Sequence, residues 1–166
     1  MKNYIQYLQE FYEDADFYLS EETKILYHGS NKDYAFDQLK IDNNLYGYYL
    51  TTSIDVAKDY GRYIKSFKLN EKAKILNLSD SDVLYSYMIK KEILDDDDQE
   101  NEDLKNYIMN GQIFQYDISS NTHYVDRIVR QVENDGYDVV KIPDQLGHGS
   151  DDIAWIVINK NVLILQ

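Results

Sequence analysis

Residues 25–30 read ILYHGS, a short apolar run that stops at a glycine. This pattern predicts a strand followed by a turn over 24–30. His28 then stands at the end of a strand, and Gly29 allows a backbone to approach a ligand closely. Binding groups are often found at the ends of strands, so this stretch is the first candidate for a functional site.

Residues 47–61 read GYYLTTSIDVAKDYG. The apolar start predicts a strand over 47–52, and the rest predicts a short helix over 54–60. Ser53 fits the N-cap of that helix, and Gly61 fits its end. A strand, a helix and a glycine stop therefore follow one another within fifteen residues.

The remaining chain mixes helical and strand patterns. Further helices are predicted over 4–19, 83–94 and 121–135, and further strands over 63–70, 73–79, 137–143, 151–159 and 162–166. The strongest helical signal is Val125, Ile128, Val129 and Val132 at positions i, i+3, i+4 and i+7, followed by Gly136 as a C-terminal stop. The only proline, Pro143, closes the strand over 137–143.

These elements fit one α+β domain over 1–166, without a repeat or a linker. Its first 22 residues hold the N-terminal helix. Residues 80–120 form a variable helical and acidic insertion, and 31–46 are predicted as a loop with some helical turn. The acidic run DDDDQENED over 95–103 is typical of a solvated loop or the surface of a helix.

The chain is strongly acidic, with 30 acidic and 17 basic residues and a formal net charge of −13. Such a surface repels phosphates and disfavours general binding to nucleic acid. It is suited to a basic partner, to imitation of nucleic acid, or to solubility alone. The absence of cysteine excludes disulfides and thiolate catalysis. A start without an apolar leader core, and the lack of any apolar run near ~18 residues, predict a cytoplasmic protein without a membrane span.

The sequence lacks the common motifs of several other enzyme classes. There is no HExxH, EF-hand loop, GxGxxG or GxxxxGK[ST], so no metal, dinucleotide-fold or P-loop site is predicted. His123 is expected on the surface of a helix, and His148 in a glycine-flanked loop. Ser30 lies on the same side of a strand as His28, but the GxSxG pattern of a serine nucleophile is missing.

Several of these stretches together resemble the ADP-ribosyltransferase superfamily. ILYHGS resembles the LWHGS stretch of poly(ADP-ribose) polymerase catalytic domains, and GYYLTTSIDVAKDY is similar to their GIYFAD segment with its following helix. WIVINKN, near the C-terminus, looks like their EYIVYD strand. Small bacterial and phage members show the same order of motifs. The match covers roughly 24–62 and 136–165, whereas 80–120 matches nothing in the family.

The resemblance implies a split β-sheet core with flanking helices and a pocket for NAD. In the family the histidine bonds a ribose hydroxyl, the next glycine contacts the nicotinamide carboxamide through its backbone, and a tyrosine stacks on the nicotinamide ring. These positions correspond to His28, Gly29 and Tyr49. Ser30, Tyr48 and Tyr60 are further candidates around the ligand, the two tyrosines as an aromatic wall or, for one of them, as core packing.

The family glutamate before the last long strand has no counterpart, because Ala154 stands in its place. A nearby carboxylate is expected to serve instead. Asp144, directly after a strand, is the first candidate, and Asp152 is the second, with Asp151 beside it. The alternative is that transfer has been lost and only binding remains.

The resemblance implies a mono-ADP-ribosyltransferase that uses NAD as co-substrate and modifies a macromolecule, preferably a protein with a basic surface. An effector of a phage or mobile element that inactivates a host protein fits this class. An NAD glycohydrolase is a second possibility, and an RNA 2′-phosphotransferase is less favoured because basic residues for a phosphate are not evident. In a different class, an inactive relative would act as an acidic inhibitor that binds a basic, nucleic-acid-binding partner.

Overall fold

The computed structural model describes residues 24–33, 47–145 and 153–166. The elements in chain order are β1 (Leu26–Ser30), β2 (Tyr48–Leu50), α2 (Ile54–Asp59), β3 (Tyr63–Leu69), β4 (Ile75–Asn77), α3 (Ser81–Lys90), α4 (Asp96–Glu100), α5 (Glu102–Met109), α6 (Ile113–Ser120), α7 (Tyr124–Asn134), β5 (Val139–Pro143), β6 (Ile153–Val157), the 3₁₀ turn η2 (Lys160–Val162) and β7 (Leu163–Leu165). The predicted helix over 4–19 and most of the predicted loop over 31–46 lie outside the described residues.

The strands form two sheets. Sheet A has the order β1-β3-β7 and is antiparallel throughout, and sheet B has the order β2-β6-β5-β4 with only the β4–β5 pair parallel. An isolated antiparallel bridge between Tyr27 and Thr51 brings β1 of sheet A beside β2 of sheet B. The architecture is therefore mixed α/β with two sheets, as the predicted α+β class requires.

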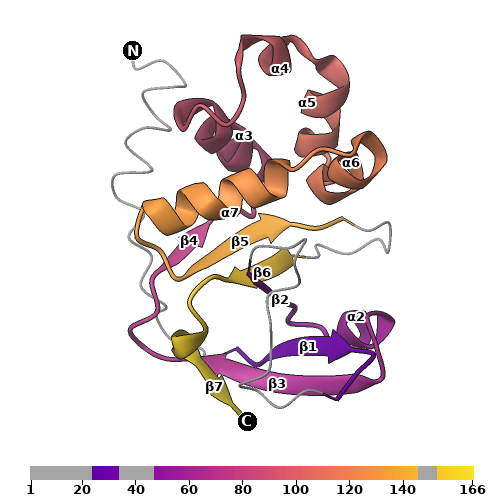
Figure 1. Ribbon diagram of the computed structural model, residues 1–166, viewed down its shortest axis with the longest axis vertical. Helices are drawn as coiled ribbons and strands as arrows, with labels where there is room; N and C mark the ends of the chain where they lie inside the picture. The colour runs from indigo at the N-terminus through magenta and orange to yellow at the C-terminus, as the bar shows by residue number, and fades with distance from the viewer. Residues whose placement is uncertain (1–23, 34–46, 146–152) are drawn as a thin grey trace.

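The molecule is layered, with helices α3–α7 at one end, sheet B in the middle and sheet A at the other end (Figure 1). One core, the helix-side core, joins α7 and the other helices to sheet B, and it includes Ile128, Val129, Val140, Ile142, Ala154 and Ile156. A second, the inter-sheet core, lies between the sheets and includes Leu26, Tyr48, Leu50, Phe67, Val139, Trp155 and Val157. Sheet B is thus buried on both faces, which explains the nearly continuous apolar run IAWIV in β6.

Helix α7 is confirmed by the structure. Val125, Ile128, Val129 and Val132, the four residues at helical spacing, are all buried. Gly136 (φ 86°) follows the helix, its N–H donates to the carbonyl of Glu133, and the N–H of Tyr137 donates to that of Val132. These two hydrogen bonds form a Schellman motif, which favours glycine at the left-handed position.

The acidic insertion is helical. Asp95 caps α4 in a capping box, in which its side chain accepts from the N–H of Asp98 and the Asp98 side chain accepts from the N–H of Asp95. The Asn101 side chain caps α5 by accepting from the N–H of Leu104. Leu104 and Ile108 face the helix-side core, whereas the acidic side chains of the run are mostly exposed. The prediction that residues 95–103 lie on the surface of a helix is therefore confirmed for α4 and the start of α5.

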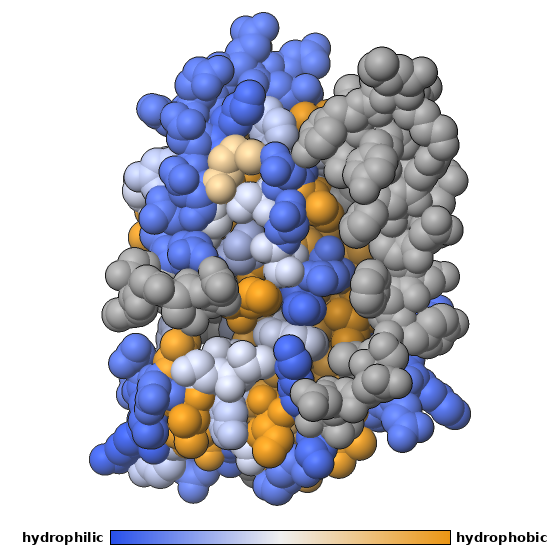
Figure 2. Space-filling view, turned by 180° about the vertical axis from the view of Figure 1, so that it is seen from behind, coloured by the Kyte–Doolittle hydropathy of each residue, from blue (hydrophilic) through white to orange (hydrophobic). Residues whose placement is uncertain are grey.

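One strand, β7, is less buried than predicted. Residues 162–166 were expected to be a buried strand, but in β7 only Leu163 is buried, and Ile164 and Leu165 are about half exposed. The reason is that β7 is an edge strand of sheet A, paired on one side with β3. Apolar residues accordingly reach the surface at the sheet A end, whereas hydrophilic residues dominate the helical end (Figure 2). No described helix is both long and apolar enough to cross a membrane.

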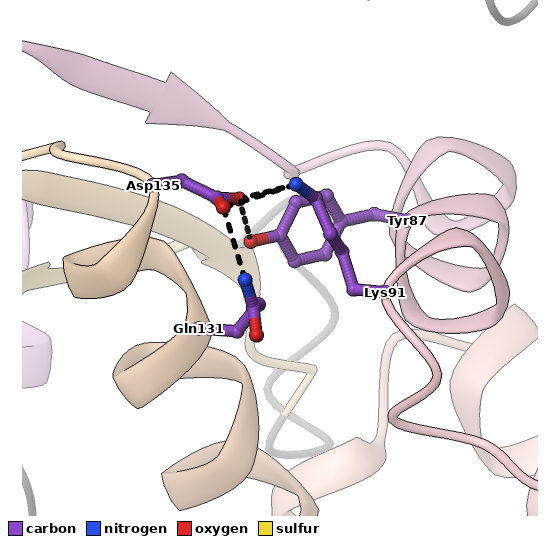
Figure 3. Close-up of polar contacts among 4 residues, drawn as sticks. All are labelled: Tyr87, Lys91, Gln131 and Asp135. Carbon is purple, nitrogen blue, oxygen red and sulfur yellow. Dashed lines mark hydrogen bonds and ion pairs between the residues drawn. The ribbon is translucent and has the colours of Figure 1, made fainter.

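A polar network fastens α3 to α7 (Figure 3). Asp135, at the C-terminal end of α7, accepts hydrogen bonds from the Tyr87 hydroxyl at 2.9 Å and from Gln131 Nε2 at 2.9 Å. The Lys91 ammonium lies 2.9 Å from the same carboxylate. Tyr87 is buried, so its hydroxyl requires this partner.

Replacing Tyr87 with Phe is expected to lower the free energy of unfolding by about 1–2 kcal/mol, because a part-buried bond to a carboxylate is lost. Urea denaturation of the native and Tyr87→Phe chains measures this. Tyr107→Phe is the matched control, since the Tyr107 hydroxyl makes no hydrogen bond within the described part of the chain, and it should change stability by less than about 0.5 kcal/mol. Equal effects of the two substitutions would contradict a stabilising role of the network.

Candidate functional site

The two sheets meet where β1 passes β2. The N–H of Tyr27 donates to the carbonyl of Thr51 at 2.7 Å, and the N–H of Thr51 donates to that of Tyr27 at 3.0 Å. His28 follows Tyr27, and its Nδ1 lies 2.9 Å from the carbonyl oxygen of Tyr49. The sheet junction therefore places the predicted histidine directly beside the backbone of the predicted tyrosine.

This contact defines the tautomer of His28. A carbonyl oxygen only accepts, so Nδ1 carries the proton and donates to Tyr49. In the neutral ring Nε2 is then an acceptor, and it has no hydrogen-bond partner among the residues that the structure describes. The imidazole is half-buried, held at one nitrogen and able to accept a hydroxyl proton at the other.

Gly29 has a packing reason to be glycine. A Cβ atom at this position would lie 1.8 Å from the carbonyl oxygen of Ala57, in α2. From the other side, a Cβ on Gly61 would lie 2.1 Å from the carbonyl carbon of Ser30. Helix α2 therefore packs directly on the backbone of β1, and its own backbone occupies the space that Gly29 leaves. The Ser30 hydroxyl accepts from the N–H of Lys32 at 3.2 Å.

Tyr49 lies on the helix side of sheet B. Successive side chains of β2 alternate, so Tyr48 and Leu50 enter the inter-sheet core and Tyr49 packs against the helix-side core. Its ring meets Phe114 of α6 edge to face, with centroids 6.0 Å apart and an interplanar angle of 71°. His28 thus contacts the backbone of Tyr49, while the phenol ring itself lies against the helices.

The other two predicted tyrosines do not join Tyr49. Tyr48 is buried on the opposite face of β2, and Tyr60 is half exposed at the end of α2. The structure therefore does not bring the three rings into one aromatic wall. Phe114, from the insertion that matched nothing in the family, takes the place beside Tyr49. Nothing in the sequence marked Phe114, because its approach depends on how α6 packs on the sheet.

The surroundings of the Tyr49 phenol are negative. Burial first, and then the charges of Asp126, Asp117 and Asp144, raise the pKa of Tyr49. The phenol therefore remains protonated. Asp144, the carboxylate that the sequence favoured, directly follows Pro143 at the end of β5 and is half-buried.

Asp117 has a structural task. Its carboxylate accepts from the N–H groups of Tyr124 and Val125 at 2.9 and 2.8 Å, and from the Thr122 hydroxyl at 2.8 Å. His123 occupies the N-cap position of α7 but makes no side-chain cap. Asp117, in α6, therefore caps α7 from a neighbouring helix.

Replacing Asp117 with Ala is expected to lower the free energy of unfolding by about 2 kcal/mol, because two N–H groups at the start of α7 lose their acceptor. Thermal and urea unfolding measure the change. Asp126→Ala, which removes a carboxylate from the first turn of α7 and breaks the surface ion pair with Arg130, should cost less than about 1 kcal/mol. If the Asp126 variant were the less stable of the two, the capping role of Asp117 would be wrong.

The helical insertion also holds the chain around Asp144. The N–H of Gln145 donates to the carbonyl of Gly111 at 2.9 Å, and Gln115 Nε2 donates to the carbonyl of Gln145 at 3.0 Å. Gly111 has φ 71°, and a Cβ there would lie 2.8 Å from Cγ of Gln145 and 3.2 Å from Cβ of Pro143. Gly111, in the turn between α5 and α6, and Gln115 of α6 thus hold the backbone at Gln145, directly after the candidate carboxylate.

The remaining predicted positions fall as follows. Ala154, in the place of the family glutamate, is buried in the helix-side core and pairs with Ile142. Asp151, Asp152 and His148 lie outside the described residues. His123 is exposed, as expected. Within the described ranges, no three histidine or acidic side chains are grouped so that they could hold a metal ion.

Comparisons with known proteins add no relative. No protein-family model matches the chain, and neither a curated protein nor a solved structure is significantly similar to it. The geometry of the site is therefore the basis for any functional proposal.

Proposed function

We propose that this chain is a mono-ADP-ribosyltransferase, which transfers ADP-ribose from NAD to a target protein. The observation that carries the proposal is the anchored imidazole of His28 at the sheet junction, next to Tyr49. Its Nε2 would accept a hydrogen bond from a ribose hydroxyl of the nicotinamide half. The resemblance of ILYHGS and GYYLTTSIDVAKDY to the superfamily supports the same assignment.

The negative surroundings of Tyr49 suit this chemistry. The nicotinamide ring of NAD is a cation, and an aromatic ring with carboxylate charges around it favours a cationic ring. As the bond between ribose and nicotinamide breaks, its electron pair leaves with nicotinamide and positive charge develops on the ribose. Asp144 would stabilise that charge, and it would then take the proton of the acceptor group as the new bond to the ribose forms.

The acidic surface supports a basic protein as the target. A net charge of −13 attracts a partner lined with lysine or arginine and increases the rate at which the two proteins meet. Asp95, Asp96, Asp97, Glu100, Glu102 and Asp103 are exposed at the helical end of the molecule. In this proposal the helical end approaches the target, while the sheet junction holds NAD.

Incubation of the chain with NAD labelled in its adenylate half, together with cell lysate, tests the proposal. The native chain should label one or a few proteins, and His28→Ala should label them at least about 100-fold more slowly. His123→Ala is the matched control and should act as the native chain does, because His123 is exposed and caps nothing. Equal labelling by the native chain and His28→Ala would refute the assigned site.

The exposed acidic residues of α4 and α5 favour a second candidate, an inactive protein that binds a basic partner. This candidate predicts stoichiometric, salt-sensitive binding to one lysate protein and no release of nicotinamide. Replacing Asp96, Asp97 and Glu100 with Asn and Gln should abolish that binding. Release of nicotinamide by the native chain, lost in His28→Ala, would exclude the inactive candidate.

A further inference from the structure

The face of sheet A that carries His28 opens away from the inter-sheet core. Leu26 of β1 pairs with Phe67 of β3, and both side chains are buried in that core. Successive side chains of a strand alternate between its two faces, so the next pair on the same face is His28 with Lys65. Both members of this pair are only half-buried. The face therefore reaches solvent at His28, with Lys65 next to it.

Lys65 stands directly across from His28. Residues opposite each other in an antiparallel pair have Cβ atoms about 5 Å apart, so the Lys65 side chain starts beside the imidazole. Its ammonium lies 3.3 Å from Oδ1 of Asp33, which follows β1. The Asp33 side chain is 70% exposed, whereas that of Lys65 is 22% exposed. An ion pair with so exposed a partner contributes little stability, and a ligand anion can replace the carboxylate.

A second cation lies at the same end of β3. Tyr63, two residues before Lys65, pairs with Ser30 and shares the face of His28. The Arg62 guanidinium lies 4.9 Å from the centre of the Tyr63 ring. Arg62 is exposed and makes no ion pair within the described residues. Alternate residues of a strand stand about 7 Å apart, so the Tyr63 ring holds this second cation close to Lys65.

We infer that Lys65 and Arg62 form an anion-binding subsite, which holds the phosphates of the ligand whose ribose His28 binds. In the proposed function this ligand is NAD, so the inference rests on that function. A single carbon joins the ribose ring to its phosphate, so a ribose hydroxyl at His28 brings the phosphate within reach of the opposing strand. Ammonium and guanidinium groups both donate charge-assisted hydrogen bonds to phosphate. Such local positive charge offsets the repulsion between the phosphates and a chain of net charge −13.

Calorimetric titration with ADP-ribose tests the subsite without turnover, because this ligand carries the ribose and both phosphates but no nicotinamide. Lys65→Gln should weaken binding about 10-fold, whereas Lys65→Arg keeps the charge and should retain most of the affinity. Lys68→Gln is the matched control and should bind as the native chain does. It removes an equal charge from β3, but Lys68 lies between the core residues Phe67 and Leu69 and so occupies the opposite face.

Asp33→Asn separates ligand binding from a structural role of the ion pair. The substitution frees the Lys65 ammonium, so ADP-ribose should bind at least as tightly as it does to the native chain, and more tightly at low salt. Arg62→Gln leaves the pair intact and should weaken binding several-fold. The subsite would be overturned if the native chain did not bind ADP-ribose, or if Lys65→Gln bound it with unchanged affinity. Weaker binding by both Lys65→Gln and Asp33→Asn would also overturn it, because both substitutions break the pair.

The two proposals can fail separately. If ADP-ribose binds as expected but the native chain never releases nicotinamide from NAD, the subsite stands and the transferase function is wrong. If NAD is consumed and Lys65→Gln leaves its KM unchanged, the function stands and the subsite is wrong. In the expected result, Lys65→Gln raises the KM for NAD about 10-fold and changes kcat much less. With nicotinamide riboside, which carries no phosphate, Lys65→Gln and the native chain should have the same KM.

Discussion

Replacing Asp144 with Asn is expected to slow nicotinamide release from NAD by about 100- to 1,000-fold. Asn has nearly the same shape but carries no charge, so it can neither stabilise a cationic ribose nor accept the proton of the acceptor group. Because Gly111 and Gln115 hold the backbone of Gln145, directly after Asp144, the substitution should leave the fold unchanged. Release of nicotinamide from NAD labelled in that ring measures the rate.

Two further variants make the Asp144 result specific. Asp144→Glu keeps the charge and should recover part of the rate. Asp103→Asn removes a charge from the exposed face of α5 and should leave the rate unchanged. An Asp144→Asn chain that is folded and releases nicotinamide as fast as the native chain would show that the carboxylate takes no part in the reaction.

Replacing Gly29 with Ala is expected to lower the free energy of unfolding by about 3 kcal/mol or more. The new Cβ would need the space of the Ala57 carbonyl oxygen, 1.8 Å away, and a backbone atom of α2 cannot move without displacing the helix. The midpoint of urea denaturation measures the loss.

Gly136→Ala is the matched control for Gly29→Ala. Gly136 has φ 86° but no atom within 4 Å of an added Cβ, so only the strained backbone contributes, about 1 kcal/mol. The difference between the two variants isolates the packing of α2 on β1. Similar stability losses would contradict the close contact between helix and strand.

Local signals allowed much of the secondary structure to be predicted. The Ser53 hydroxyl does accept from the N–H of Val56, and Gly61 does follow α2. The apolar spacing of α7 and its glycine stop were equally clear. Its start was misplaced by about three residues, because Asn121 adopts a left-handed conformation at the end of α6 (φ 51°) and the cap comes from Asp117, outside the helix.

The order of the strands could not be predicted in the same way. Strand β6 pairs with β2, and β7 returns to β3, although in each pair the two strands are far apart in the sequence. Such pairing depends on which apolar faces pack together, and a single sequence does not encode that locally. The division into two sheets was therefore an expectation from resemblance alone.

The candidate site, too, could be predicted from the sequence only in part. His28 and Asp144 stood at recognisable places, at the ends of apolar runs, and Tyr49 stood within one; in the structure the His28 ring meets the Tyr49 backbone, and the Asp144 charge acts on the Tyr49 phenol. Phe114 carries no local signal, because it gains its place beside Tyr49 through tertiary packing. Tyr48 shows the opposite difficulty, because it stands next to Tyr49 in the sequence. Adjacent residues of a strand face opposite sides of the sheet, so the Tyr48 ring cannot lie beside the Tyr49 ring.

A crystal structure of the chain with a non-hydrolysable NAD analogue tests the central claim most directly. We predict that a ribose hydroxyl of the analogue lies within hydrogen-bond distance of Nε2 of His28, with the nicotinamide ring near Tyr49. An analogue bound elsewhere on the molecule, or one that fails to bind at millimolar concentration, would contradict the account.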